Sequence, residues 1–286
     1  MAGPLTGKTA VVTGSNSGIG KMTALELAKA GATVVMVCRP GDKSEAAYSE
    51  IAAVVGDYGV ELMTADLSSQ ASIRACATEF KRTHKKLDIL VNNAGVFLPD
   101  RQVTVDGLER TFAINHLAYF LFTNLVLDLL KASLPARIIC VASEAERTGK
   151  IDFKDLQGEK RYSGLKAYSQ SKIANILFTY ELARRLAGTG VTANCLHPGG
   201  VNTGWGRNAK GLLRMGITLF RRFLLTPEQG AQTSIYLASS AEVEGITGGY
   251  FIKCKPVRSI SSSYDLDLAD KLWDVSEKLT GLSQTD

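Results

Sequence analysis

The stretch Thr13-Gly14-Ser15-Asn16-Ser17-Gly18-Ile19-Gly20 stands between a β-branched run, Thr9–Thr13, and a segment rich in helix formers, Lys21–Ala30. Glycines allow a tight turn and a close backbone approach to a pyrophosphate, whose charge the next helix N-terminus stabilises. A glycine turn also serves plain strand–helix packing, but its place in a first strand–turn–helix unit favours nucleotide binding by residues 14–20. The loop lacks the Gly-Lys-Ser/Thr ending of an ATP phosphate loop, which disfavours kinase chemistry.

Strand and helix patterns alternate along the rest of the chain. Apolar runs predict strands at Thr33–Cys38, Glu61–Thr64, Ile89–Val91, Arg137–Val141, Val191–Leu196 and Gly249–Ile252. Helices are predicted at Lys21–Ala30, Ser44–Val55, from a cap at Ser68 to about His84, and at Asn115–Lys131, Lys166–Leu186 and Thr226–Ala238. Such alternation predicts a parallel sheet with helices on both faces. The length fits one large or two small domains, but no linker or repeat divides the chain. We therefore predict one doubly wound Rossmann-type α/β domain over residues 1–286, with about seven strands.

Composition excludes several classes of function. The net charge of +5 is mild and its basic residues are spread along the chain, so no nucleic-acid partner is expected. Five cysteines form no CxxC pair and three histidines share no ligand spacing, so we predict reduced thiols and no metal. No signal-peptide pattern opens the sequence, and Leu117–Leu130 is too short to span a bilayer. We expect a cytoplasmic or peripheral membrane protein.

The end of the second predicted strand indicates the cofactor. An acidic residue there would bind the ribose 2′-hydroxyl of NAD, whereas an arginine accommodates the 2′-phosphate of NADP. Cys38-Arg39-Pro40 offers an arginine and no acid. Arg39 can bind a phosphate with two parallel N–H donors, and Lys21 could add charge. A solvated loop arginine is the alternative, but the missing acid independently favours NADP(H).

Five features coincide along the chain: the glycine loop, Asp66-Leu67, Asn92-Asn93-Ala94-Gly95, Ser143 after a strand, and Tyr168-Ser169-Gln170-Ser171-Lys172. Together, and in this order, they resemble the classical short-chain dehydrogenase/reductase family over nearly the whole chain. The resemblance implies that Ser143 hydrogen-bonds the reacting oxygen and that Asn115 holds a water on the proton path. It also implies further cofactor-binding residues. Asp66 would hydrogen-bond the adenine, Asn93 and Gly95 would line the adenosine side, and Lys172 would hold the nicotinamide ribose. The others are Leu67, Ala94, Tyr168, and Pro198, Gly199 and Val201 in a segment that closes on the nicotinamide.

Tyr168 and Lys172 have the spacing that acid–base catalysis needs. Residues four apart lie on one face of a helix. A free tyrosine has a pKa of about 10, and a nearby ammonium lowers it by favouring the phenolate. Tyr162 and Lys166 have the same spacing, but Ser163-Gly164 between them is typical of a loop, whereas the residues after Lys172 continue an apolar helix. We therefore predict that Tyr168 is the proton-transfer group.

Other stretches resemble the retinol dehydrogenase branch that prefers NADP, including Val37-Cys38-Arg39 and Gly149–Phe153. The resemblance implies a lipophilic alcohol or carbonyl substrate. A nucleotide-binding scaffold or redox sensor without turnover is the alternative, and a sugar-nucleotide epimerase is a third.

A variable substrate lobe is expected at about residues 200–228. Within it, 211–225 is apolar and basic, and would form a lid, a packed helix or a peripheral membrane contact. The predicted helix Asn115–Lys131 has enough apolar residues to permit a homodimer.

Overall fold

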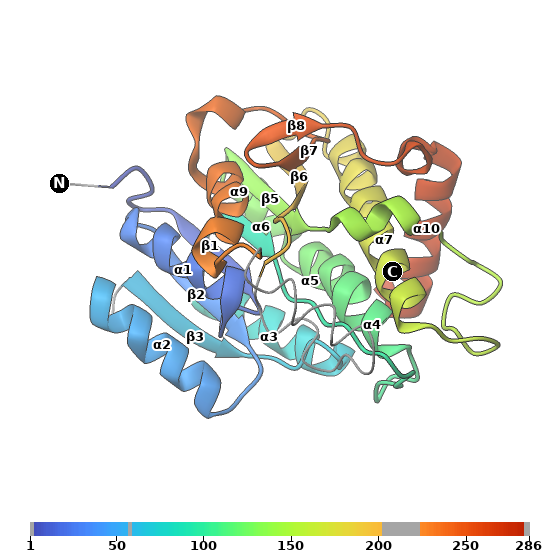
Figure 1. Ribbon diagram of the computed structural model, residues 1–286. Helices are drawn as coiled ribbons and strands as arrows, with labels where there is room; N and C mark the ends of the chain where they lie inside the picture. The colour runs from blue at the N-terminus through green and yellow to red at the C-terminus, as the bar shows by residue number, and fades with distance from the viewer. Residues whose placement is uncertain (1–2, 57–58, 202–223, 283–286) are drawn as a thin grey trace.

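The computed structural model describes residues 3–56, 59–201 and 224–282. One eight-stranded sheet forms its centre, in the order β3-β2-β1-β4-β5-β6-β7-β8 (Figure 1). The first seven strands are parallel and β8 is antiparallel to β7. The strands are β1 Thr9–Thr13, β2 Thr33–Cys38, β3 Val60–Thr64, β4 Ile89–Asn92, β5 Ala136–Val141, β6 Val191–His197, β7 Tyr250–Ile252 and β8 Lys255–Val257. The prediction of a doubly wound parallel sheet is confirmed.

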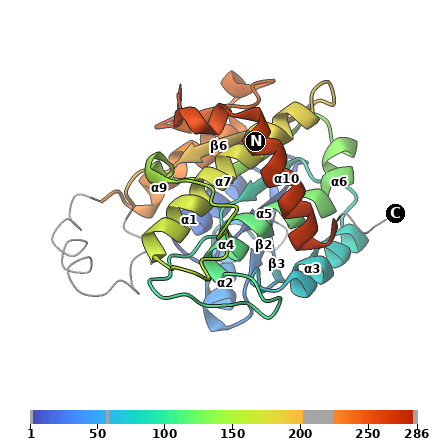
Figure 2. The ribbon, with the colours of Figure 1, turned by 90° about the vertical axis from the view of Figure 1, so that its right-hand side faces the viewer.

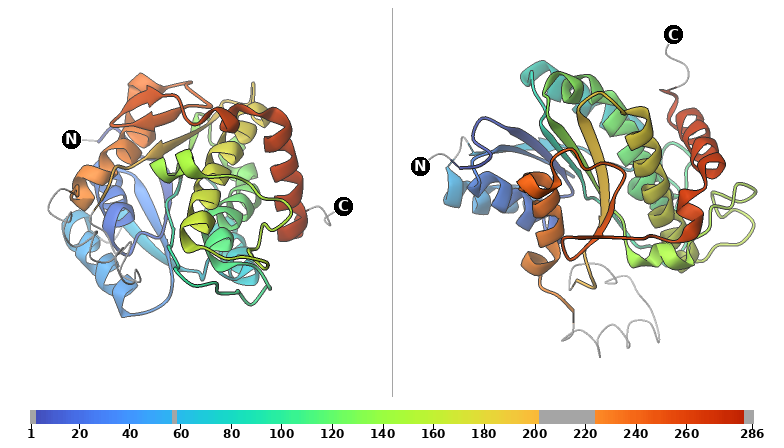
Figure 3. Two further views of the ribbon diagram at one scale, coloured as in Figure 1. Left: turned by 45° about the vertical axis from the view of Figure 1, so that its right-hand side comes forward. Right: turned by 90° about the horizontal axis from the view of Figure 1, so that it is seen from above.

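Helices cover both faces of the sheet, as the view from above shows (Figure 3). The larger ones are α1 Gly18–Lys29, α2 Asp42–Val55, α3 Gln70–Thr83, α5 Ala118–Leu125, α7 Gly164–Arg185, α9 Pro227–Ser239 and α10 Leu266–Thr280. The shorter ones are α4 Arg110–Phe112, α6 Leu127–Ala132, the π-helix η2 Ala113–Leu117, and the 3-10 helices η3 Glu144–Thr148, η5 Ala241–Val243 and η6 Ser261–Tyr264. Helices α1, α2 and α9 pack on one face, and α3, α5 and α7 on the other.

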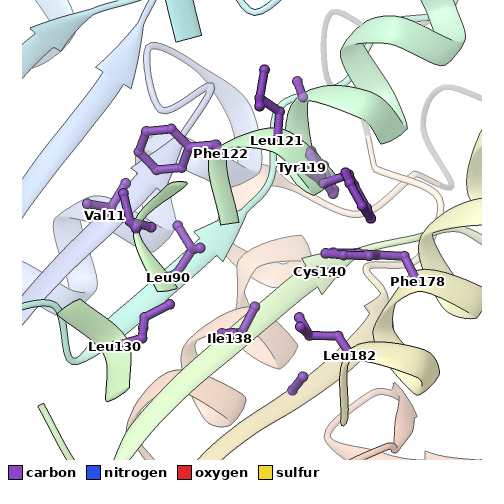
Figure 4. Packing of buried hydrophobic residues seen from close by; sticks show 14 of the residues in the cluster. Val11, Leu90, Tyr119, Leu121, Phe122, Leu130, Ile138, Cys140, Phe178 and Leu182 are labelled. Atoms are coloured by element: carbon purple, nitrogen blue, oxygen red, sulfur yellow. The ribbon is translucent and has the colours of Figure 1, made fainter. Parts of the chain in front are cut away.

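The two-residue repeat of a strand divides the core into two layers. Val11 of β1 joins the layer under α3, α5 and α7, whereas its neighbours Ala10 and Val12 join the layer under α1 and α9. Figure 4 shows the first layer, to which Phe178 of α7 and Cys140 of β5 both belong. Both sheet faces are therefore apolar, which explains the near-continuous apolar strands.

Three details of the elements differ from prediction. Strand β8 was not predicted, because its three residues are all exposed and include Pro256. Ser68 does not cap α3: Ser69 is the N-cap and accepts from the Ser72 N–H, while Ser68 donates to Asp66. The helix predicted as continuous over Asn115–Lys131 is split into η2, α5 and α6, with a break at Val126.

Helix α10 was not predicted either, and it packs against α7, α5 and η2 (Figure 2). Trp273 of α10 lies against Phe120 and Phe178, with ring centroids 4.8 and 5.8 Å apart. Residues 118–123 of α5 are all buried within the chain. The apolar content that permitted a homodimer through this helix is therefore explained by the chain's own core.

Candidate active site

The predicted cofactor and catalytic residues gather at the carboxyl edge of the parallel sheet. The glycine loop follows β1, Arg39 follows β2, Asn93 follows β4, Ser143 follows β5 and Pro198 follows β6. Strand order reverses between β1 and β4, and ligands of doubly wound sheets bind at such a switch point. The topology therefore brings these separate motifs to one region.

The glycine loop is closely packed against the turn after β4. Gly14 has φ +65°, and a Cβ there would lie 2.8 Å from the Ala94 Cα. A Cβ on Gly20 would lie 2.3 Å from the Asn93 side-chain nitrogen. Larger residues at these two positions would push the loop away from its support.

Asn93 and Thr13 brace this loop. The Asn93 side-chain amide donates to the carbonyl oxygens of Thr13 and Gly14, at 2.8 and 3.3 Å. The Thr13 hydroxyl accepts from the N–H groups of Asn93 and Ala94, at 2.9 and 3.1 Å. The Asn93 amide nitrogen is thus engaged with the loop backbone, which gives it a loop-positioning role beside its predicted place near the adenosine. Thr13 was missed, because its role depends on a partner 80 residues away.

The segment after β6 lies against the first turn of α1. A Cβ on Gly230 of α9 would lie 2.5 Å from a Val201 methyl group and 3.2 Å from Ile19. Val201 also pairs with Leu225 as an isolated parallel bridge. Ile19 and Val201, predicted cofactor residues from opposite ends of the chain, therefore share one neighbourhood. Residues 202–223, most of the predicted substrate lobe, lie outside the described part of the chain.

Arg39 is exposed at the rim of the site, near Asp66. Partial burial raises the pKa of the Asp66 carboxyl, but hydrogen bonds from the Ser68 N–H and hydroxyl, with the charge of Arg39, hold it below its usual value. Asp66 is therefore ionised at neutral pH and accepts hydrogen bonds. This suits its predicted contact with an adenine amino group.

Tyr168 and Lys172 lie one turn apart near the start of α7. The Lys172 ammonium lies 5.5 Å from the centroid of the Tyr168 ring. Lys172 is 3% exposed, and its Nζ donates to the Val141 carbonyl oxygen at 3.0 Å. Burial lowers the pKa of Lys172 from 10.5 to about 8, because a charged ammonium is costly away from water. The pair has the geometry that was predicted from its spacing.

Asn115 is held by hydrogen bonds to its neighbours in the fold. Its Oδ1 accepts from the Val96 N–H at 2.8 Å, and its Nδ2 donates to the Val96 carbonyl and the Ser171 hydroxyl, each at 3.0 Å. Ser171 in turn donates to the Tyr168 carbonyl at 2.7 Å. This chain of bonds connects η2 to the turn that carries Tyr168. Ser171 was missed, although it lies within the motif that was quoted.

Ser143 caps η3, and η3 packs directly on the first turns of α7. The Ser143 hydroxyl accepts from the Ala145 N–H at 3.2 Å. Farther along η3, the hydroxyls of Thr148 and Ser169 are 3.1 Å apart. The turn bearing Ser143 is thus placed beside the turn bearing Tyr168.

Tyr162 has a different environment. Its hydroxyl donates to the Leu98 carbonyl and to Glu109, at 3.1 and 3.2 Å, and it precedes α7. Burial and the Glu109 carboxylate raise its pKa to about 12. Tyr162 therefore fastens the loop before α7.

An aromatic wall adjoins Tyr168. Phe97 is buried and meets the Tyr168 ring edge-on, with centroids 6.0 Å apart. Phe97 was not singled out from the sequence, because its apolar run after the predicted strand has no distinctive spacing.

The residues present fit a nicotinamide cofactor. A Cβ on Gly95 would stand 3.5 Å from the Asn115 Oδ1 and 3.6 Å from the Lys172 Nζ, so the absent side chain leaves space beside the buried ammonium. A ribose in that space could accept hydrogen bonds from Lys172. The glycine loop lies on the other side of the turn that follows β4 and carries Gly95, and a pyrophosphate would bind at that loop.

Comparison with known proteins agrees with this geometry. Residues 8–211 match the family model described as short chain dehydrogenase. The chain belongs to the short-chain dehydrogenase family. Among its relatives, retinol dehydrogenase 14 from Homo sapiens is 47% identical over 98% of this chain and 88% of its own length. The sequence thus falls in the retinol dehydrogenase branch of the family.

Two solved structures extend the comparison. An uncharacterized protein from Mycobacterium paratuberculosis superimposes with a TM-score of 0.78 at 34% identity, covering 98% of this chain and 96% of its own. A proposed NAD(P)-dependent gluconate 5-dehydrogenase from Beutenbergia cavernae, with NADP bound at low occupancy, has a TM-score of 0.70 at 30% identity, covering 87% and 96%. The chain is accordingly an oxidoreductase of a family that uses nicotinamide cofactors on alcohol groups.

Within residues 3–56, 59–201 and 224–282, no group of three His, Cys, Asp or Glu side chains could hold a metal ion. In the same ranges, no helix has the length and apolarity to cross a bilayer.

Proposed function

We propose that this chain is an NADP(H)-dependent oxidoreductase that acts on a lipophilic alcohol or carbonyl compound, of the retinol or retinal type. The observation that carries the proposal is the buried Lys172 beside Tyr168, at the edge where the glycine loop turns. Placing an ammonium in a 3% exposed position costs stability. A scaffold without turnover has no need of this cost, which favours an enzyme.

The residues of the site divide the chemistry between them. The bound nicotinamide would donate or accept the hydride. In the reductive direction, the Tyr168 hydroxyl gives its proton to the substrate oxygen as negative charge develops there; in oxidation, its phenolate accepts that proton. The positive charge of Lys172 lowers the cost of the phenolate. The Ser143 hydroxyl donates a hydrogen bond to the same oxygen and stabilises its charge.

Asn115 and Ser171 position this machinery. Their hydrogen bonds fix the Tyr168 carbonyl and the Val96 backbone relative to each other. A water held near Asn115, as the family resemblance implies, would then return a proton to Lys172.

Three observations support the finer assignments. Arg39 is exposed after β2, where a 2′-phosphate would lie. The Phe97 ring meets the Tyr168 ring edge-on and would give a substrate an apolar neighbour. The relative named above is a retinol dehydrogenase.

The test is to follow NADPH consumption with aldehydes from short aliphatics to retinal, and to repeat it with NADH. Turnover of a long apolar aldehyde with an NADPH preference is expected. The Arg39→Ala variant should raise the KM for NADPH by about tenfold or more, because a charge-assisted bond to phosphate is lost, and leave the KM for NADH nearly unchanged. NADPH binding without turnover of any aldehyde would instead support the scaffold.

A further inference from the structure

A second cation reaches the glycine loop from the start of α2. The Lys43 Nζ donates to the Ser17 hydroxyl at 2.9 Å. Ser17 is the N-cap of α1 and belongs to the loop predicted to bind the cofactor. Lys43 lies four residues after Arg39, so both cations come from the segment that follows β2. The sequence pattern gave no reason to single out Lys43.

A buried hydroxyl fixes the position of this segment. Ser44 is 1% exposed, and its hydroxyl donates to the Arg39 carbonyl at 2.6 Å. The same hydroxyl accepts from the Asn16 side-chain amide at 3.0 Å. One side chain therefore connects the backbone that carries Arg39, the glycine loop and the first turn of α2. The hydrogen bonds of Ser44 therefore fix the backbone next to Lys43, so that the position of Lys43 beside the loop does not depend on its flexible side chain alone.

The other nearby lysine is differently engaged. Lys21, which the sequence offered as an auxiliary cation, forms an ion pair with Glu50 of α2. That carboxylate offsets its charge. Asp42 and Glu45 also lie in the first turn of α2, but both are exposed, where water and salt screen them. Lys43, at the N-terminus of α2, also lies where the helix dipole favours an anion.

We propose that Lys43, with Arg39 and the Ser17 hydroxyl, binds the phosphate on the 2′-oxygen of the cofactor's adenosine ribose. The inference rests on the proposed use of NADP(H). A phosphate monoester carries about −1.5 to −2 charges at neutral pH, so two cations neutralise it better than Arg39 alone. Arg39 supplies a planar fork, and Lys43 supplies a compact charge between the phosphate and the loop.

The test measures binding of 2′,5′-ADP and 5′-AMP by calorimetry, without turnover. Wild type should bind 2′,5′-ADP more tightly. Lys43→Ala should weaken the binding of 2′,5′-ADP by about tenfold and leave the binding of 5′-AMP unchanged, because only the first ligand carries the contacted phosphate. Lys43→Arg should restore most of that affinity. Lys21→Ala is the matched control, because it also removes one lysine beside the same loop. It should weaken the binding of 2′,5′-ADP by less than about threefold at 0.15 M salt.

The outcomes separate this inference from the proposed function. If Lys43→Ala keeps the full preference for 2′,5′-ADP over 5′-AMP while Arg39→Ala loses it, the role of Lys43 is overturned. The NADP assignment would still stand. If Lys43→Ala and Lys21→Ala lose equal affinity for 2′,5′-ADP, the two lysines act through the long-range field of their positive charges. That result would also overturn the contact between Lys43 and the phosphate. A wild-type protein that binds both ligands equally would overturn both proposals.

Discussion

Replacement of Lys172 by methionine should stabilise the cofactor-free protein while it removes turnover. Lys172 is buried and its pKa falls from 10.5 to about 8. At 1.36 kcal/mol per pH unit, keeping this ammonium charged at pH 7 costs about 3 kcal/mol of folding free energy. Methionine has a similar length and no charge, so it should fill the same space without that cost.

A lost hydrogen bond reduces the gain. The Lys172 Nζ donates to the Val141 carbonyl at 3.0 Å, and losing this bond costs about 1 to 2 kcal/mol. The carbonyl also accepts from the Asn175 side chain at 3.4 Å, so it keeps a partner. The net expectation at pH 7 is an increase of about 1 to 2 kcal/mol in the free energy of unfolding.

The pH dependence gives the sharper test. The pKa of Lys172 is lower in the folded than in the unfolded state, so the unfolded state binds more protons between about pH 8 and 10.5. Wild-type stability should therefore rise through this window relative to the variant. Below about pH 8 both states are charged and the advantage of Lys172→Met is complete; above about pH 10.5 it is gone.

Urea unfolding at pH 7 and about pH 10 measures this difference, because other titrating groups are common to both proteins. Lys166→Met is the control, since Lys166 is an exposed lysine on the same helix, and it should change stability by less than about 0.5 kcal/mol. A Lys172→Met protein that is less stable than wild type at pH 7, by the same amount at both pH values, would refute the argument from burial.

Three further substitutions test other parts of the structure. Tyr168→Phe should reduce turnover by about a hundredfold or more yet keep the Kd for NADPH within about twofold, and an active variant would remove the proposed proton donor. Trp273→Ala should lower the free energy of unfolding by about 3 to 5 kcal/mol in urea, because α10 packs on Phe120 through this ring; a loss under about 1 kcal/mol would contradict that packing. Ser171→Ala should lower kcat several-fold without changing the KM for cofactor, because Asn115 loses its link to the Tyr168 carbonyl; an equal change in both constants would show a general loss of structure.

Local patterns were sufficient for most of the fold. Seven strands and five of the helices were predicted close to their observed bounds, because each has its own apolar run or period, whereas the predicted helix Asn115–Lys131 proved to be three shorter ones. The Tyr168–Lys172 spacing predicted a shared helix face, since four residues make about one turn. Positions that needed distant partners were missed. Helix α10 gains its stability by packing on α5 and α7, and β8 is an exposed strand that pairs with β7.

The sequence by itself determined the alternation of strands and helices, the glycine loop and the order of the catalytic motifs, because these depend on neighbours within about one or two turns of chain. Only the tertiary structure decided which atoms each motif meets. Strand order placed Asn93 under the glycine loop, and packing on β5 buried Lys172 and lowered its pKa. The turn into α2 brought Lys43 to Ser17. Burial, charge and hydrogen bonding at a site arise between segments far apart in the chain, and no local pattern records them.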